Sequence, residues 1–425
     1  MTLDWERLRR GMLIHLASLA GAGLSRFGLG LVLARLLAPA ELGLSAMALA
    51  IVGVMQVLRD AGLSAWLQQS RELDTPQLRA AAGLSLASSV LAAGALYMAS
   101  GLLARRFVTP GLEAQLHVLC LGLLLTSYGS LRTSLALREL NAAHIARVSH
   151  VGAAAHALAS VAFSLLGWGA PGLAWAYVIN IAVCNTVHVL RPGTRLALPW
   201  RPALRGWREP LRFGLGNMTG ALLQTLHSAV PDLLVGLLGT PRLVGLQGRA
   251  QGLLGLSAGV FGAALCFGAL PELSALHHRG GRVGPLLWRA IGLLAAVSVP
   301  LLALTVLCGP VLIVRLYGAA WVEAAPALLP LAVAAELALL LQPLGIALVA
   351  IGRPELAAAN TGLALLARLV CLPLAFDGTL LSCAWSLAWA ALLAAPLQAW
   401  LAARHLGLVE STLQPWLRLR STIRK

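Results

Sequence analysis

Twelve runs of about 20 mainly apolar residues follow one another along the chain, and only short charged or Pro/Gly-rich breaks separate them. A helix of about 20 apolar residues crosses the hydrocarbon core of a bilayer, so these runs predict membrane spans. The composition agrees, because 59% of the 425 residues are hydrophobic and only 11% are charged, whereas soluble domains contain about 25% charged residues. A soluble globular enzyme, a disordered protein and a secreted disulfide scaffold are therefore excluded.

The apolar runs are continuous, which distinguishes helices from strands. Strands of a transmembrane barrel appear as segments of about 10 residues with alternating polarity, and the runs do not show this alternation. We therefore expect an all-α polytopic membrane protein with about 12 transmembrane helices. The expected spans are 11–37, 42–66, 79–103, 114–135, 146–168, 170–190, 211–237, 243–270, 288–314, 324–350, 355–376 and 379–402.

The net charge of +16 follows mostly from membrane orientation. Cytoplasmic loops carry an excess of Lys and Arg, and with twelve spans both termini lie on one side. That side holds 22 of the 32 basic residues, the opposite side holds 5, and 5 lie within spans. Both termini are therefore predicted to be cytoplasmic, and no nucleic acid is needed to explain the charge. The basic segments 191–212 and 404–425 on this side are expected to contact anionic membrane lipids.

The spans fall into two related halves. With an offset of 202, LVLARLLAPAELGL (31–44) aligns with LLVGLLGTPRLVGL (233–246), so that Pro39 matches Pro241 and Gly43 matches Gly245. Duplicated transporters of this kind have their substrate path between the halves. The expected domains are an N-terminal six-helix bundle over 1–190, a cytoplasmic basic linker over 191–212, a C-terminal six-helix bundle over 213–402 and a cytoplasmic basic tail over 403–425, the bundles being related by pseudo-two-fold symmetry.

Five segments resemble polysaccharide transporters of the Wzx type, which belong to the multidrug/oligosaccharidyl-lipid/polysaccharide (MOP) exporter superfamily. They occur in the expected order and are ARLLAPAELGL (34–44), DAGLSAWLQQ (60–69), DLLVGLLG (232–239), RLYGAAWVEAAPAL (315–328) and IGRPELAAANTG (351–362). The resemblance implies a MATE-like fold. It also implies a flippase that moves undecaprenyl-diphosphate-linked oligosaccharide from the cytoplasmic to the periplasmic leaflet of the bacterial inner membrane, for O-antigen, capsule or exopolysaccharide synthesis. Polysaccharide polymerase and glycosyltransferases are then candidate partners.

Polar side chains within the spans are candidates for contacting such a substrate. An ionised side chain at the centre of a span costs about 2.5–3.5 kcal/mol on insertion scales, so it usually faces a cavity, water or a partner. Arginines can bind the two phosphates by bidentate, charge-assisted hydrogen bonds, and amide side chains on polar helix faces can bind sugar hydroxyls. The candidate substrate-binding residues are Arg26, Arg249, Arg368, Asn217, Gln224 and Asn360.

Four further charged residues have more than one interpretation. Asp232 and Glu336 are ion-coupling candidates, and each is alternatively the charge partner of an arginine. Arg59 beside Asp60 favours an interfacial ion pair. Arg132 is interpreted as a side chain that snorkels to the cytoplasmic side. The less favoured alternative for both Arg59 and Arg132 is that they line the substrate cavity.

The remaining features indicate structure rather than chemistry. The six cysteines lie in apolar stretches without paired ligands, and no phosphate-binding Gly loop with Lys occurs, so we expect no catalytic residue, metal or cofactor. Tryptophans near span ends, among them Trp66, Trp168, Trp321 and Trp400, are interpreted as interfacial anchors. The alternatives to the flippase are a multidrug or cation antiporter or a lipid II flippase of the same superfamily and, more distantly, a membrane enzyme of polysaccharide assembly.

Overall fold

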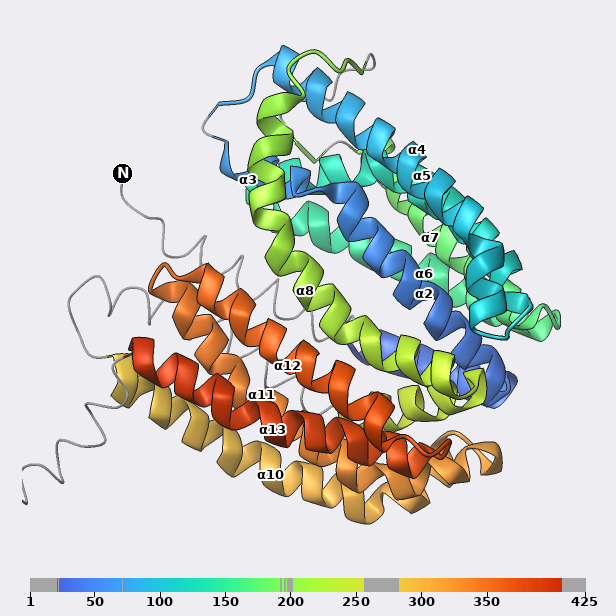
Figure 1. Ribbon diagram of the computed structural model, residues 1–425. Coiled ribbons are helices and arrows are strands. Elements are labelled where there is room, and N and C mark those ends of the chain that lie inside the picture. The colour runs from blue at the N-terminus through green and yellow to red at the C-terminus, as the bar shows by residue number, and fades with distance from the viewer. Residues whose placement is uncertain are drawn as a thin grey trace, which may run out of the picture. The chain divides into compact units, whose positions relative to one another are not determined.

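The computed structural model describes residues 21–406 apart from 22, 71, 192, 195, 197–201 and 256–282. Its regular elements in this part are all helical (Figure 1). They are α2 (Pro39–Asp60), α3 (Leu63–Gln69), α4 (Thr75–Arg106), α5 (Gly111–Arg138), α6 (Ala142–Leu165), α7 (Gly169–Leu190), α8 (Arg208–Leu238), α10 (Val283–Leu316), the 3-10 helix η1 (Ala319–Ala327), α11 (Leu328–Ala350), α12 (Pro354–Ala375) and α13 (Leu380–Leu406). Residues 23–36 and 241–255 are also helical.

Ten candidate membrane spans occur in the described part of the chain, which confirms the prediction of an all-α polytopic membrane protein. They correspond to ten of the twelve predicted spans. The other two, 11–37 and 243–270, are helical over 23–36 and 241–255, and their remaining residues lie outside the described part. The predicted basic tail also lies outside it from residue 407 onward.

The start of α4 shows how local sequence fixes a helix boundary. Asp74 precedes the helix, and its side chain accepts a hydrogen bond from the backbone N–H of Gln77 (2.8 Å). The Gln77 side chain accepts one in return from the backbone N–H of Asp74 (3.1 Å). This reciprocal capping box satisfies two backbone donors that a helix N-terminus otherwise leaves unpaired.

The predicted span 42–66 is interrupted, because α2 ends at Asp60 and α3 begins at Leu63. Ala61 (φ 44°) and Gly62 (φ 72°) both have left-handed backbone conformations, which end a helix. A side chain on Gly62 would also overlap the backbone of Gly214 in α8. The break therefore depends on a close approach to a helix about 150 residues away in sequence, and the apolar pattern around residue 61 does not reveal it.

Two of the predicted interfacial tryptophans are buried in protein. Trp66 in α3 is 3% exposed and packs in a cluster that contains Leu67 and Leu131, and Trp321 in η1 is fully buried. The interfacial interpretation is wrong for these two residues, because tertiary contacts rather than position along the span determine their burial. Trp168 and Trp400 are exposed, as the interpretation requires.

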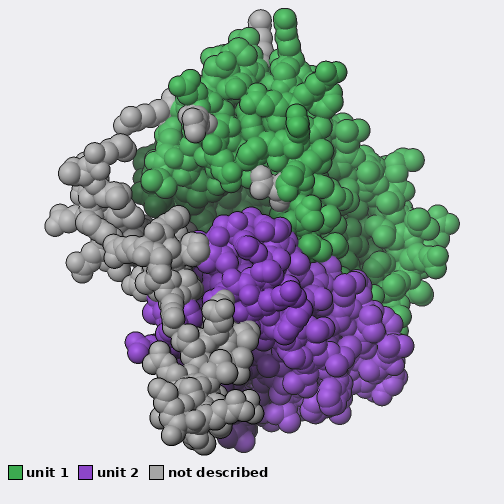
Figure 2. All heavy atoms as spheres, turned by 60° about the vertical axis from the view of Figure 1, so that its left-hand side comes forward, with its two compact units in different colours: residues 1–248, 316–321 green, residues 249–315, 322–425 purple. Residues whose placement is uncertain are grey.

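The chain forms two compact units, coloured separately in Figure 2. Unit 1 comprises Met1–Gly248 and Leu316–Trp321, and unit 2 comprises Arg249–Arg315 and Val322–Lys425. Within unit 1, α4 packs on α5, α5 and α6 pack on α7, and α2 packs on α8; within unit 2, α11, α12 and α13 pack on one another. The division into bundles 1–190 and 213–402 stays a prediction.

Candidate functional site

Four candidate residues lie in unit 1, namely Arg26, Asn217, Gln224 and Asp232. Arg26 is exposed on the helical segment 23–36, and Gln224 is exposed on α8. Asp232 lies eight residues further along the same face of α8 and is half-buried. Within the described part of the chain, Asp232 makes neither an ion pair nor a hydrogen bond, so no arginine partner is seen there. Asn217 belongs to the first turns of α8, and its side chain is not among those that the structure describes.

The other four candidates, Arg249, Glu336, Asn360 and Arg368, lie in unit 2. Asn360 in α12 is buried; its backbone carbonyl accepts a hydrogen bond from Gln398 Nε2 (2.8 Å), and its side-chain oxygen has no partner among the described residues. Arg368 is half-buried about two turns further along α12, on the same face. Arg249 is also half-buried.

Glu336 has a polar environment of its own within unit 2. Its Oε1 accepts a short hydrogen bond from Ser298 Oγ (2.6 Å), and Ser298 on α10 is fully buried. The second carboxyl oxygen is buried and has no partner among the described residues. The neighbour that the structure shows for Glu336 is therefore a neutral hydroxyl.

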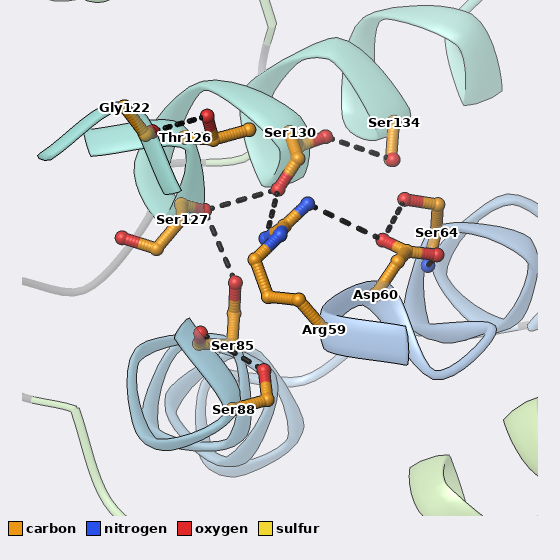
Figure 3. Close-up of polar contacts among 10 residues, drawn as sticks. All are labelled: Arg59, Asp60, Ser64, Ser85, Ser88, Gly122, Thr126, Ser127, Ser130 and Ser134. Atoms are coloured by element: carbon orange, nitrogen blue, oxygen red, sulfur yellow. Dashed lines mark hydrogen bonds and ion pairs between the residues drawn. The ribbon is translucent and has the colours of Figure 1, made fainter. Parts of the chain in front are cut away.

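Arg59, at the end of α2, is the most deeply buried arginine of the described residues, with 5% exposure. Its Nη1 donates to Ser130 Oγ (3.3 Å), and its Nη2 lies 4.0 Å from Asp60 Oδ1, which is too long for a hydrogen bond (Figure 3). Its Nε has no partner in the described part. The interpretation as an interfacial ion pair is incomplete, because this guanidinium lies inside the protein and retains an unused donor.

Hydroxyl groups surround Arg59, as Figure 3 shows. Ser85 Oγ of α4 and Ser130 Oγ of α5 both donate to the carbonyl oxygen of Ser127 (3.2 Å each). Asp60 Oδ1 accepts a hydrogen bond from Ser64 Oγ (2.6 Å), so the carboxylate divides its charge between two neighbours. This cluster was not predicted from the sequence. The sequence signal for it is the spacing of Ser127, Ser130 and Ser134, three and four residues apart on one face of α5.

Arg132 of α5 is buried. Its Nε donates to the Tyr128 hydroxyl (3.0 Å), and its Nη1 donates to Thr194 Oγ1 (3.0 Å) and to the carbonyl oxygen of Leu196 (3.3 Å). Thr194 and Leu196 belong to the connection between α7 and α8. Arg132 thus holds this connection to α5. The connection covers the side chain and belongs to the segment predicted to be cytoplasmic, so snorkelling to that side stays a prediction.

The polar side chains within the spans are chemically suited to binding anions and sugar hydroxyls. Guanidinium, amide and hydroxyl groups bind anions and sugar hydroxyls by hydrogen bonds and charge attraction. Among the described residues, no group of three or more His, Cys, Asp and Glu side chains is placed to hold a metal ion.

The fold is similar to that of two solved transport proteins. A multidrug resistance transporter of the MATE family, in the MOP superfamily, matches with a TM-score of 0.74 at 15% sequence identity, covering 94% of this chain and 99% of that chain. The lipid II flippase MurJ matches with a TM-score of 0.76 at 9% identity, covering 91% of this chain and 87% of MurJ. The chain therefore shares the fold of these two proteins, and the ten candidate spans in its described part make it a multi-pass membrane protein.

Within this class, the sequence specifies the family. The polysaccharide biosynthesis protein family matches residues 32–326, more than half of the chain, so the chain belongs to that family. It is also similar to the teichuronic acid biosynthesis protein TuaB of Bacillus subtilis (strain 168), with 24% identity over 335 residues, which are 78% of this chain and 68% of TuaB. The resemblance to MOP-type polysaccharide transporters is thereby confirmed.

Proposed function

We propose that this protein is a flippase that translocates undecaprenyl-diphosphate-linked oligosaccharide from the cytoplasmic to the periplasmic leaflet of the bacterial inner membrane. The observation that supports this most is that a polysaccharide biosynthesis family matches a chain with a transporter fold. A transporter in such a biosynthesis has a lipid-linked saccharide precursor as its natural cargo. MurJ, a flippase for lipid II, has the same fold, which supports a lipid-linked substrate by analogy.

The proposed substrate contacts are the polar residues within the spans. Arg26, Arg249 and Arg368 would bind the diphosphate, because a guanidinium fork matches two phosphate oxygens at once. The amides of Asn217, Gln224 and Asn360 would bind sugar hydroxyls. Asn360 fits this role, since its buried side-chain oxygen has no partner among the described residues.

The proposed coupling residues are Asp232 and Glu336. A carboxyl group whose described neighbour is a serine hydroxyl can take up and release a proton without breaking an ion pair. Transport would follow alternating access, in which repeat units move against one another around the substrate site.

Reconstitution in liposomes tests the function directly. Purified protein should move a fluorescent undecaprenyl-diphosphate oligosaccharide between leaflets, measured as the fraction of label that becomes accessible to an added glycosidase. The matched control is the same oligosaccharide on a neutral polyprenol, which lacks the diphosphate and should remain in its leaflet. Export of cationic drugs without any movement of the lipid-linked oligosaccharide would contradict the proposal and favour an antiporter.

Fusions to alkaline phosphatase test the proposed orientation, because this enzyme is active only outside the cytoplasm. A fusion after Lys425 should be inactive, and a fusion after Thr240, in the short connection that follows α8, should be active. The reason is the excess of basic residues on the side of the termini. High activity of the C-terminal fusion would overturn the topology.

A further inference from the structure

Two histidines of unit 1 form a buried pair at the ends of three helices. His144 in the first turn of α6 and His188 in the last turn of α7 are 3% and 2% exposed. His144 Nε2 lies 3.0 Å from His188 Nδ1, and His188 Nε2 lies 3.3 Å from Thr133 Oγ1 of α5. His144 Nδ1 is buried and has no hydrogen-bond partner among the described residues. We call these two residues the histidine pair.

The connection that follows α7 packs against the histidine pair. A β-carbon on Gly193 would overlap Cγ and Cδ2 of the His144 ring and lie 2.5 Å from Nδ1, so the backbone of residue 193 lies directly on the ring. Asn141 Nδ2 donates to the carbonyl oxygen of Gly193 (2.7 Å). Together with the hydrogen bonds that Arg132 donates to the connection, these contacts hold residues 193–196 on the ends of α5 and α6.

The hydrogen bonds of the histidine pair determine where an added proton must go. The neutral pair carries two protons on four ring nitrogens; one is shared between the rings, and the other lies on an outer nitrogen. A third proton fills both outer nitrogens, which are His188 Nε2, beside the Thr133 hydroxyl, and His144 Nδ1, for which the described residues offer no acceptor. Protonation therefore creates a buried, charged N–H group without a partner, which is more costly than a neutral one.

The charged groups around the histidine pair also disfavour an added proton. Arg132 of α5 acts electrostatically on both imidazoles, and Arg147 of α6 acts on His144. Glu139 of α5 accepts a hydrogen bond from a backbone N–H of the connection (3.3 Å). Arg191, where the connection begins, is exposed. The pair thus lies among positive charges, and contact with water would stabilise its protonated form.

We propose that the histidine pair is a pH-sensitive switch, which holds residues 193–196 on unit 1 when it is neutral and releases them when it takes up a proton. The neutral His144 ring presents an uncharged face on which Gly193 packs. The protonated ring needs an acceptor at Nδ1, and residue 193 lies beside this atom. Water can serve as that acceptor when the connection moves away. Acidification on the side predicted to be cytoplasmic would thus loosen the connection between α7 and α8, whatever substrate the protein carries.

Hydrogen exchange of the full-length protein tests the switch without a transport assay. The measured quantity is the protection factor of the amides of residues 193–196, relative to the unfolded protein at the same pH. The released state binds one proton more than the attached state, so attachment weakens by up to about tenfold for each pH unit below the midpoint. Between about pH 8 and about pH 5, where histidine titrates, the protection factor should fall at least about tenfold. An unchanged protection factor in the wild-type protein would overturn the proposal.

Two variants identify the group that titrates. His144→Gln keeps an N–H donor in place of Nε2 but does not titrate in this range, so it should retain protection at both pH values. His150→Gln replaces an exposed histidine of the same helix and should respond as the wild type does. A response of wild-type size in His144→Gln would assign the titration to another group, such as Glu139, and refute the switch. Loss of protection in His144→Gln at both pH values would also refute it, because a neutral donor would then not hold the connection.

Discussion

Replacement of Trp321 by alanine is expected to lower the free energy of unfolding by about 3–5 kcal/mol, the range for truncating a large aromatic side chain in a packed core. The Trp321 side chain is fully buried and lies near Tyr317, which is 2% exposed. Truncation would leave a cavity in this cluster and remove the hydrogen bond to the carbonyl oxygen of Ala34. The loss should be seen as a lower thermal midpoint of the detergent-solubilised protein, measured as the monodisperse fraction that survives heating.

Two variants control this prediction. Trp321→Phe keeps most of the volume but loses the donor, so it should cost about 1–3 kcal/mol, the penalty for an unpaired buried acceptor. Trp389→Ala removes a tryptophan of α13 that is 53% exposed, and it should change stability little in detergent. If Trp321→Ala and Trp389→Ala have the same midpoint, burial of Trp321 does not contribute as the structure indicates.

Trp321 also shows what the sequence cannot reveal. Its place next to a predicted span end favours a membrane-interface anchor, and Trp168 in a similar place is indeed exposed. Trp321 donates a hydrogen bond to Ala34, which lies 287 positions earlier in the chain, and the neighbouring Arg35 donates to Leu316 across 281 positions. No local pattern encodes such a contact. The segments 34–44 and 315–328 both carry the family resemblance, but the resemblance does not indicate that they contact each other.

The spans themselves were predictable, because hydropathy acts locally and each helix satisfies its own backbone hydrogen bonds. The residues at which the spans begin and end were harder to predict. The span predicted over 42–66 is divided at Gly62 by close packing against Gly214. The span predicted to begin at residue 324 is a 3-10 helix as far as Ala327.

For the polar residues too, position along one helix could be read from the sequence, whereas contacts with other helices could not. Sequence position identified Glu336 as a buried acid, but not that its described neighbour is Ser298 on another helix. It placed Arg59 and Arg132 at the membrane surface, whereas α4 and α5 enclose the first and the connection before α8 covers the second. Spacing along one helix predicts which side chains share a face, but burial of a charge depends on which helices pack around that face.

Replacement of Arg26, Arg249 and Arg368 together by alanine is expected to reduce flipping in liposomes by at least about 100-fold. A hydrogen bond to a charged group contributes about 1.5–3 kcal/mol, and 1.36 kcal/mol corresponds to a tenfold change in rate, so each single variant should lose roughly tenfold if its guanidinium binds the diphosphate in the transition state. Lysine at the same positions keeps the charge but not the bidentate geometry, so the triple lysine variant should lie between wild type and the triple alanine variant.

The control for this prediction is Arg289→Ala, which removes an exposed arginine of α10 near the predicted cytoplasmic face and should flip at the wild-type rate. All variants must insert normally, checked by their amount in the membrane fraction and their monodispersity in detergent. The comparison separates charge from position, because each single variant and the control lose the same charge. Normal flipping by the triple alanine variant would exclude these arginines as the diphosphate site. Arg59, buried among hydroxyls with an unused donor, would then be the next arginine to replace.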